Sequence, residues 1–137
     1  MILKLYYKIW VDFIKKVQSI PANKNNWKGI TVVFMSMAMA INLVTIMTIL
    51  QRNIFKYTFY DVKVDIFPGS MLNSLTSFFI LFLLPNLIIN YFLIFRNERY
   101  KILLNKFKSY NGKLFFSYFA ISLLAPLVFV IIWKIFF

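Results

Sequence analysis

Residues able to carry acid–base chemistry are few in this chain of 137 residues, which has four acids and neither histidine nor cysteine. General acid–base catalysis needs a positioned group with a tuned pKa, most often His, Glu or Asp. Asp12 lies four residues from both Lys8 and Lys16, and this helical spacing predicts an ion pair on a solvated face. Glu98 is also surrounded by basic neighbours, so we expect the same role for it.

The other two acids, Asp61 and Asp65, lie four residues apart in segment 60–66, where apolar and charged residues alternate. This alternation predicts a strand that presents both carboxylates on one face. Two carboxylates are too few ligands for a calcium or magnesium site. The chain contains no phosphate-binding loop, nucleotide fingerprint or nucleophile motif. We therefore predict no enzyme activity, no metal or other cofactor, and no small-molecule substrate.

The elements that must position the remaining polar groups are long and apolar. Hydrophobic residues make up 61% of the chain, whereas about 45–50% is usual for a soluble domain. Three stretches carry no charge at all, namely residues 29–51, 66–95 and 114–133. Each stretch is long enough to cross a bilayer as a helix, which needs about 20 residues. The sequence therefore predicts an integral membrane protein with three spans.

Amides and hydroxyls are the polar groups inside these spans. Counting at about 1.5 Å per residue places Asn86 at the depth of Ser122, and Asn90 at the depth of Ser117. This match predicts a hydrogen-bonded hairpin of spans two and three, with Asn42 near the level of Asn86. We interpret the five residues as interhelical contacts, each bond contributing about 0.6 kcal/mol on average. A polar cavity or a docking face for another subunit is the alternative.

The expected fold class is an all-α integral membrane protein with three transmembrane helices, an N-terminal amphipathic interfacial helix, and a short cytoplasmic amphipathic helix between spans two and three. A cleaved signal peptide is the alternative for the first span, because Ala38-Met39-Ala40 resembles a cleavage site. Against it, the apolar run begins far from the N-terminus and continues past Ala40. The single membrane domain, 1–137, is divided into an interfacial helix 2–20, span 29–50, an external link 51–70, span 71–95, a basic cytoplasmic segment 96–112, and span 114–133.

Two basic segments have amphipathic helical periodicity. In residues 2–20 an aromatic-rich apolar stripe faces a lysine-rich side, and Pro21 ends the helix. In residues 96–112 the pattern is similar, and Asn111-Gly112 is a helix stop. We expect both helices to lie in the membrane surface, although docking of the stripes on a partner protein is an alternative. The residues expected at lipid headgroups are Lys4, Lys8, Trp10, Lys15, Lys16, Trp27, Lys28, Arg96, Arg99, Lys101, Lys106, Lys108 and Trp133.

The distribution of basic residues predicts the orientation. The segment before span one and the segment between spans two and three together hold twelve Lys and Arg, against four elsewhere. Because positive residues stay inside, we expect a cytoplasmic N-terminus and an external C-terminus. We therefore expect the basic residues behind the net charge of +12 to bind anionic phospholipids rather than nucleic acid. Thirteen Lys against three Arg indicate an AT-rich, bacterial genome, hence the bacterial inner membrane.

The expected function is that of a non-catalytic accessory or scaffolding subunit in a larger membrane complex. Its partner would be a membrane protein or a second copy of the chain, because three spans bury little of their own surface. The alternatives are a membrane-active protein of holin or toxin type and a protective protein of bacteriocin-immunity type. An enzyme that modifies lipids is disfavoured by the lack of acid–base groups.

Overall fold

The computed structural model describes residues 2–56, 65–66 and 68–136, and in these ranges the chain is almost entirely helical and forms no strand. The strand expected over 60–66 lies mostly outside the described residues, and Asp65 and Ile66 have no regular secondary structure. Three helical stretches are long and apolar enough to cross a membrane. These are Trp27–Ile54, Ser70–Lys106 and Lys113–Phe136.

The described residues form eleven helical elements. In chain order they are α1 (Ile2–Ser19), η1 (Pro21–Asn23), α2 (Trp27–Leu50), η2 (Gln51–Phe55), α3 (Ser70–Phe78), η3 (Phe79–Leu83), α4 (Leu84–Asn90), η4 (Tyr91–Phe95), η5 (Arg96–Glu98), α5 (Arg99–Lys106) and α6 (Lys113–Phe136). Elements η1 and η5 are 3₁₀ turns, whereas η2, η3 and η4 are π-helical turns that continue or join the α-helices.

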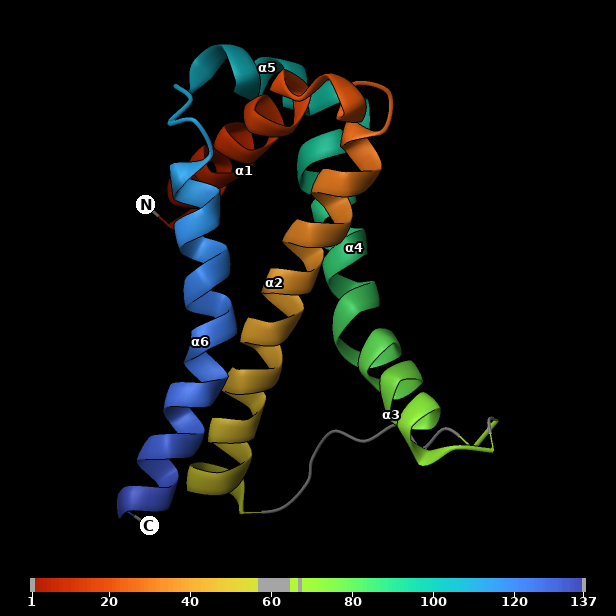
Figure 1. Ribbon diagram of the computed structural model, residues 1–137, viewed down its shortest axis with the longest axis vertical. Helices are drawn as coiled ribbons and strands as arrows, with labels where there is room; N and C mark the ends of the chain where they lie inside the picture. The colour runs from red at the N-terminus through yellow and green to blue at the C-terminus, as the bar shows by residue number, and fades with distance from the viewer. Residues whose placement is uncertain (1, 57–64, 67, 137) are drawn as a thin grey trace.

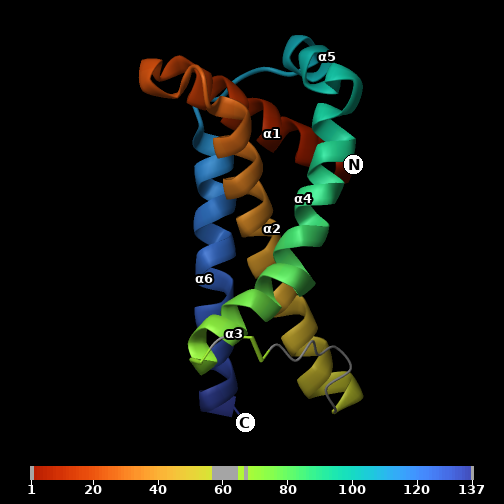
Figure 2. The same cartoon turned by 90° about the vertical axis from the view of Figure 1, so that its right-hand side faces the viewer.

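Proline determines two features of these helices. Helix α1 ends because Ile20, which precedes Pro21, adopts an extended conformation. In the second span, Pro85 has no N–H to donate to the preceding turn, and the wide turn η3 lies directly before it. Helix α3 bends away from the direction of α4 at this turn (Figures 1 and 2). Pro126, in contrast, lies inside α6 without interrupting it.

The segment between spans two and three is less helical than expected. Asn97 and Glu98 have positive φ angles and turn the chain out of the span. Helix α5 then ends at Lys106, because Phe107 is extended. A short helix is thus present in the basic segment 96–112, but the predicted helix stop at Asn111-Gly112 is wrong, because these residues lie directly before α6.

Helix α2 forms the centre of the molecule, with α6 on one side and α4 on the other (Figure 1). Helix α1 lies obliquely at one end of the spans and packs against α2, α5 and α6. We call this the basic end, since α1, α5 and their connections, residues 2–28 and 96–113, hold the twelve basic residues counted above. Its core includes Trp10, Ile14, Met35 and Ile94, all at most 1% exposed. The end that holds the C-terminus is called the opposite end.

Candidate functional site

Asp12 is fully buried, and its carboxylate accepts hydrogen bonds from four backbone N–H groups. Oδ1 accepts from Tyr110 at 2.6 Å and from Gly112 at 3.0 Å. Oδ2 accepts from Leu114 at 2.9 Å and from Phe115 at 3.4 Å. The first N–H groups of a helix have no acceptor within the helix, and a negative charge is favoured there. Asp12 of α1 therefore caps the N-terminus of α6.

The solvated ion pair predicted for Asp12 is thus wrong. Its side chain lies on the face of α1 that is buried against the start of α6, and Lys16 bonds elsewhere, donating from Nζ to Asn111 Oδ1 at 3.1 Å. Within the described part of the chain the ion pair present is Lys101 with Glu98, at 2.8 Å and exposed. The lysine lowers the pKa of the Glu98 carboxyl through its hydrogen bond.

Two further contacts hold α1 against the segment before α6. Lys15 Nζ donates to the carbonyl oxygen of Phe107 at 3.1 Å. Gly112 has φ +82°, and a Cβ there would lie 2.9 Å from Cγ of Lys16, so close approach requires glycine. We call Asp12, Lys15 and Lys16 on α1, together with segment 107–115, the Asp12 clamp.

Apolar packing reinforces the clamp. The rings of Phe13 and Phe115 are stacked, with centroids 3.5 Å apart. Trp10 is 0% exposed and packs edge-on against Phe95 at 5.7 Å. Tyr100 of α5 is also buried in this core. The expectation that Trp10 lies among lipid headgroups is therefore wrong, because the aromatic stripe of α1 packs against the chain's own helices.

A chain of polar side chains links α1, α2 and α4 below this core. Asn90 Nδ2 donates to Ser36 Oγ at 2.7 Å, and Tyr6 donates its hydroxyl proton to Asn90 Oδ1 at 2.6 Å. Asn90 and Ser36 are both fully buried. Burial raises the pKa of the Tyr6 hydroxyl above its ordinary value.

A second polar contact joins α2 to α6. Asn42 Nδ2 lies 2.9 Å from both Ser122 Oγ and the Tyr118 hydroxyl. Asn86 instead donates to the carbonyl oxygen of Phe82 in its own span, and Ser117 is exposed. The predicted pairing of spans two and three is wrong because α2 lies between them, so Asn90 and Ser122 each bond to a residue of α2.

Small residues let α2 serve both neighbours. Ser36, Ala38 and Ala40 of α2 are each 0% exposed. Their small side chains permit close approach of the flanking helices.

The remaining residues expected at headgroups lie mostly near the surface. Lys28 is exposed, with Nζ 5.7 Å from the ring centroid of Trp27, which is half-buried against Tyr100. Lys8 is half-buried, and Trp133 is half-buried at the opposite end beside Arg52. The exposed ones are Lys4, Arg96, Arg99, Lys101, Lys106 and Lys108.

Chemically, the basic end is an assembly of structural bonds. Each oxygen of Asp12 already accepts two hydrogen bonds from backbone N–H groups, so the carboxylate is held in one position between α1 and the start of α6. Among the described residues no three His, Cys, Asp or Glu side chains gather as metal ligands.

The role of Asp12 had one signal in the sequence that the helical spacing concealed. Helix α6 starts at Lys113, and the residue before it is Gly112, which has no side-chain acceptor for the first N–H groups of the helix. A buried helix start without a local cap needs an acceptor from elsewhere, and α1 contains a single acid.

The chain was compared with models of protein families, with curated proteins and with solved structures. None of the three comparisons gives a match. What the protein does must therefore be argued from the geometry described above.

Proposed function

We propose that this chain is a non-catalytic accessory or scaffolding subunit of a larger complex in the bacterial inner membrane, with its basic end in the cytoplasm. The observation that carries the proposal is the outward face of α6. The chain fixes this helix firmly at its start, yet covers little of its length. In its most apolar window 11% of residues are buried, against 28% for each of the other two spans.

The outward face of α6 has features of a helix-packing surface. Ser117 and Ala120 are both exposed and lie on one side of the helix with Leu124 and Ile131. Small residues permit close approach of helices in membranes, and a serine hydroxyl can bond across to a neighbour. Within the described part of the chain, the Ser117 hydroxyl has no hydrogen-bond partner. This face supports docking of a span from another membrane protein.

The aromatic stripes of the basic end do not support docking. Trp10, Phe13 and Tyr100 are buried within the chain, so they are not available to a partner. Their burial instead supports a scaffold role, because it holds α6 at a defined angle to α1. The proposed orientation rests on the distribution of basic residues, with twelve at this end and four elsewhere.

The experiment is site-directed photocrosslinking in the native membrane, with the full-length chain. A photoreactive residue replacing Leu124 on the outward face of α6 is expected to form an adduct with one other membrane protein. The control replaces Val33, which is 51% exposed on α2 and belongs to a different face of the bundle. It is expected to give no discrete adduct.

Two results would contradict the proposal. One is a chain that elutes from mild detergent as a lone monomer and gives no adduct at position 124. The other is an adduct that contains two copies of this 16.4-kDa chain and no other protein. That result would favour the self-assembling, membrane-active alternative.

A further inference from the structure

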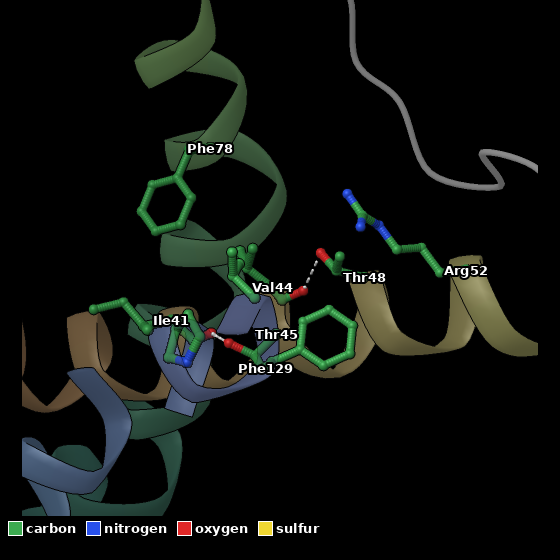
Figure 3. A pocket seen from close by; sticks show the side chains of 9 residues that line it. Ile41, Val44, Thr45, Thr48, Arg52, Phe78 and Phe129 are labelled. Atoms are coloured by element: carbon green, nitrogen blue, oxygen red, sulfur yellow. Dashed lines mark hydrogen bonds between the residues drawn. The ribbon is translucent and has the colours of Figure 1, made fainter. Parts of the chain in front are cut away.

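Residues of α2, α3 and α6 line a groove in the half of the molecule toward the opposite end, where α3 bends away from the direction of α4 (Figures 1 and 2). Its volume is about 220 Å³. Figure 3 shows how Ile41 and Val44 of α2, Phe78 of α3 and Phe129 of α6 surround it. The two threonines in its wall, Thr45 and Thr48, use their hydroxyls to bond the helix backbone at 2.9 Å. The wall is therefore effectively apolar.

One cation lies at the mouth of this groove. Arg52, in the turn η2 that continues α2, lines the cavity and is exposed. Its guanidinium lies 5.2 Å from the ring centroid of Trp133 near the end of α6. Tryptophan and arginine at the ends of spans are typical of the membrane–water interface. Across the described residues, Arg52 forms no ion pair.

The wall and the charge of the groove favour one kind of occupant. At about 220 Å³ the groove is smaller than the about 300 Å³ at which pockets for drug-sized ligands begin. Its wall offers hydrocarbon surface, since both threonine hydroxyls already bond the helix backbone, and its lining includes the cation Arg52. A hydrocarbon chain attached to an anionic headgroup matches both features.

We propose that the groove holds one acyl chain of an anionic phospholipid, from the leaflet at the opposite end, and that Arg52 binds its phosphate. A guanidinium presents several donors in a planar fork that matches phosphate oxygens. The Trp133 ring, with its centroid 5.2 Å from the guanidinium, holds this fork near the end of the span. This lipid site is separate from the outward face of α6, so it does not depend on the proposed docking surface.

The test reconstitutes the full-length protein into vesicles that contain a photoactivatable phosphatidylglycerol or the corresponding phosphatidylcholine, with the reactive group in the middle of one acyl chain. Peptide mapping then measures adducts on groove residues alone, which separates this site from lipids held at the basic end. We expect phosphatidylglycerol to label the groove several-fold more than phosphatidylcholine.

Two pairs of variants make the test specific. Arg52→Gln is expected to lower groove labelling by phosphatidylglycerol about tenfold, whereas Lys56→Gln removes the same charge nearby, outside the groove lining, and should change nothing. Val44→Trp fills the groove and should abolish labelling by either lipid. Ile46→Trp adds the same ring to an exposed site on α2 and should not.

Equal labelling by the two lipids, unaffected by Arg52→Gln, would overturn the proposal. So would full labelling of Val44→Trp, because the acyl chain would then lie elsewhere. If Val44→Trp does not fold, the Arg52 and Lys56 pair decides the matter alone, since both positions are exposed at the end of the span.

Discussion

At the basic end, Trp10, Ile14 and Ile94 are at most 1% exposed, whereas at the opposite end Ile54, Met71 and Ile135 are 64–75% exposed. The difference comes from helices outside the spans. Helices α1 and α5 cover the basic end, and Asp12 fixes α1 to the start of α6. The opposite end has no such layer among the described residues, and there α3 diverges from its neighbours. Among the described residues of this molecule, the bundle is closed at the end where α1 and α5 add a further layer.

The largest effect should follow removal of the Asp12 carboxylate, which would make the basic end resemble the opposite one. Asp12→Ala leaves four backbone N–H groups without an acceptor, and we expect a loss of about 2–4 kcal/mol in the free energy of unfolding. Unfolding of the reconstituted protein in denaturing detergent measures it. Asp12→Asn keeps one acceptor oxygen and should lie between, and a wild-type stability for Asp12→Ala would refute the cap.

Gly112→Ala should have the next largest effect, because it strains the clamp without removing a polar group. The φ of +82° and the 2.9 Å contact with Lys16 both oppose a Cβ at this position, so we expect a loss of about 1–2 kcal/mol. Gly29→Ala is the matched control. A Cβ at Gly29 meets nothing within 4 Å, so that variant should be unchanged or slightly stabilised.

Asn90→Ala tests the polar link between α2 and α4 at the border of the two regions. It removes the bonds to Ser36 and Tyr6, which at about 0.6 kcal/mol each in membranes predicts a loss of about 1 kcal/mol. Ser117→Ala alters an exposed hydroxyl on the outward face of α6 and should leave the stability of the isolated chain unchanged. Equal losses of stability in Asn90→Ala and Ser117→Ala would contradict the assignment of Asn90 as a link between α2 and α4.

Glu98→Gln should have the smallest effect, although it removes an ion pair at the basic end. Because Lys101 lowers the pKa of Glu98, any stabilisation is present above the ordinary carboxyl pKa and is lost as pH falls through the lowered value. Both side chains are more than half exposed, so solvent and salt screen the pair. Melting curves of the wild type and the variant should coincide at every pH, and a difference confined to neutral pH would show that the pair matters.

The sequence predicted the spans well and their packing poorly, for physical reasons. The absence of charge over 29–51, 66–95 and 114–133 shows that each segment is compatible with the lipid interior. The structure has a long, apolar helical stretch over most of each segment. Which span contacts which is a tertiary property. Matching depths alone could not reveal that α2 lies between the other two spans, so Asn90 was assigned to Ser117 instead of Ser36.

Asp12 shows the same limit at one residue. Its spacing from Lys8 and Lys16 is the same whether it faces water or the start of α6, so local periodicity describes both cases equally. The decisive information lies about a hundred residues away, in a helix start that has no cap of its own. Likewise, periodicity correctly predicts an apolar, aromatic-rich face on α1, but it does not predict what covers that face.

The most direct test of this account uses the lack of native cysteine. A single cysteine replaces Val17, which is 4% exposed on α1, and its rate of reaction with a water-soluble maleimide is measured in vesicles with and without Asp12→Ala. A cysteine at exposed Ser19 is the control. We predict that Asp12→Ala accelerates labelling at position 17 at least about tenfold and leaves position 19 unchanged. If the two rates at position 17 are the same, α1 is held by the lipid surface and not by the clamp.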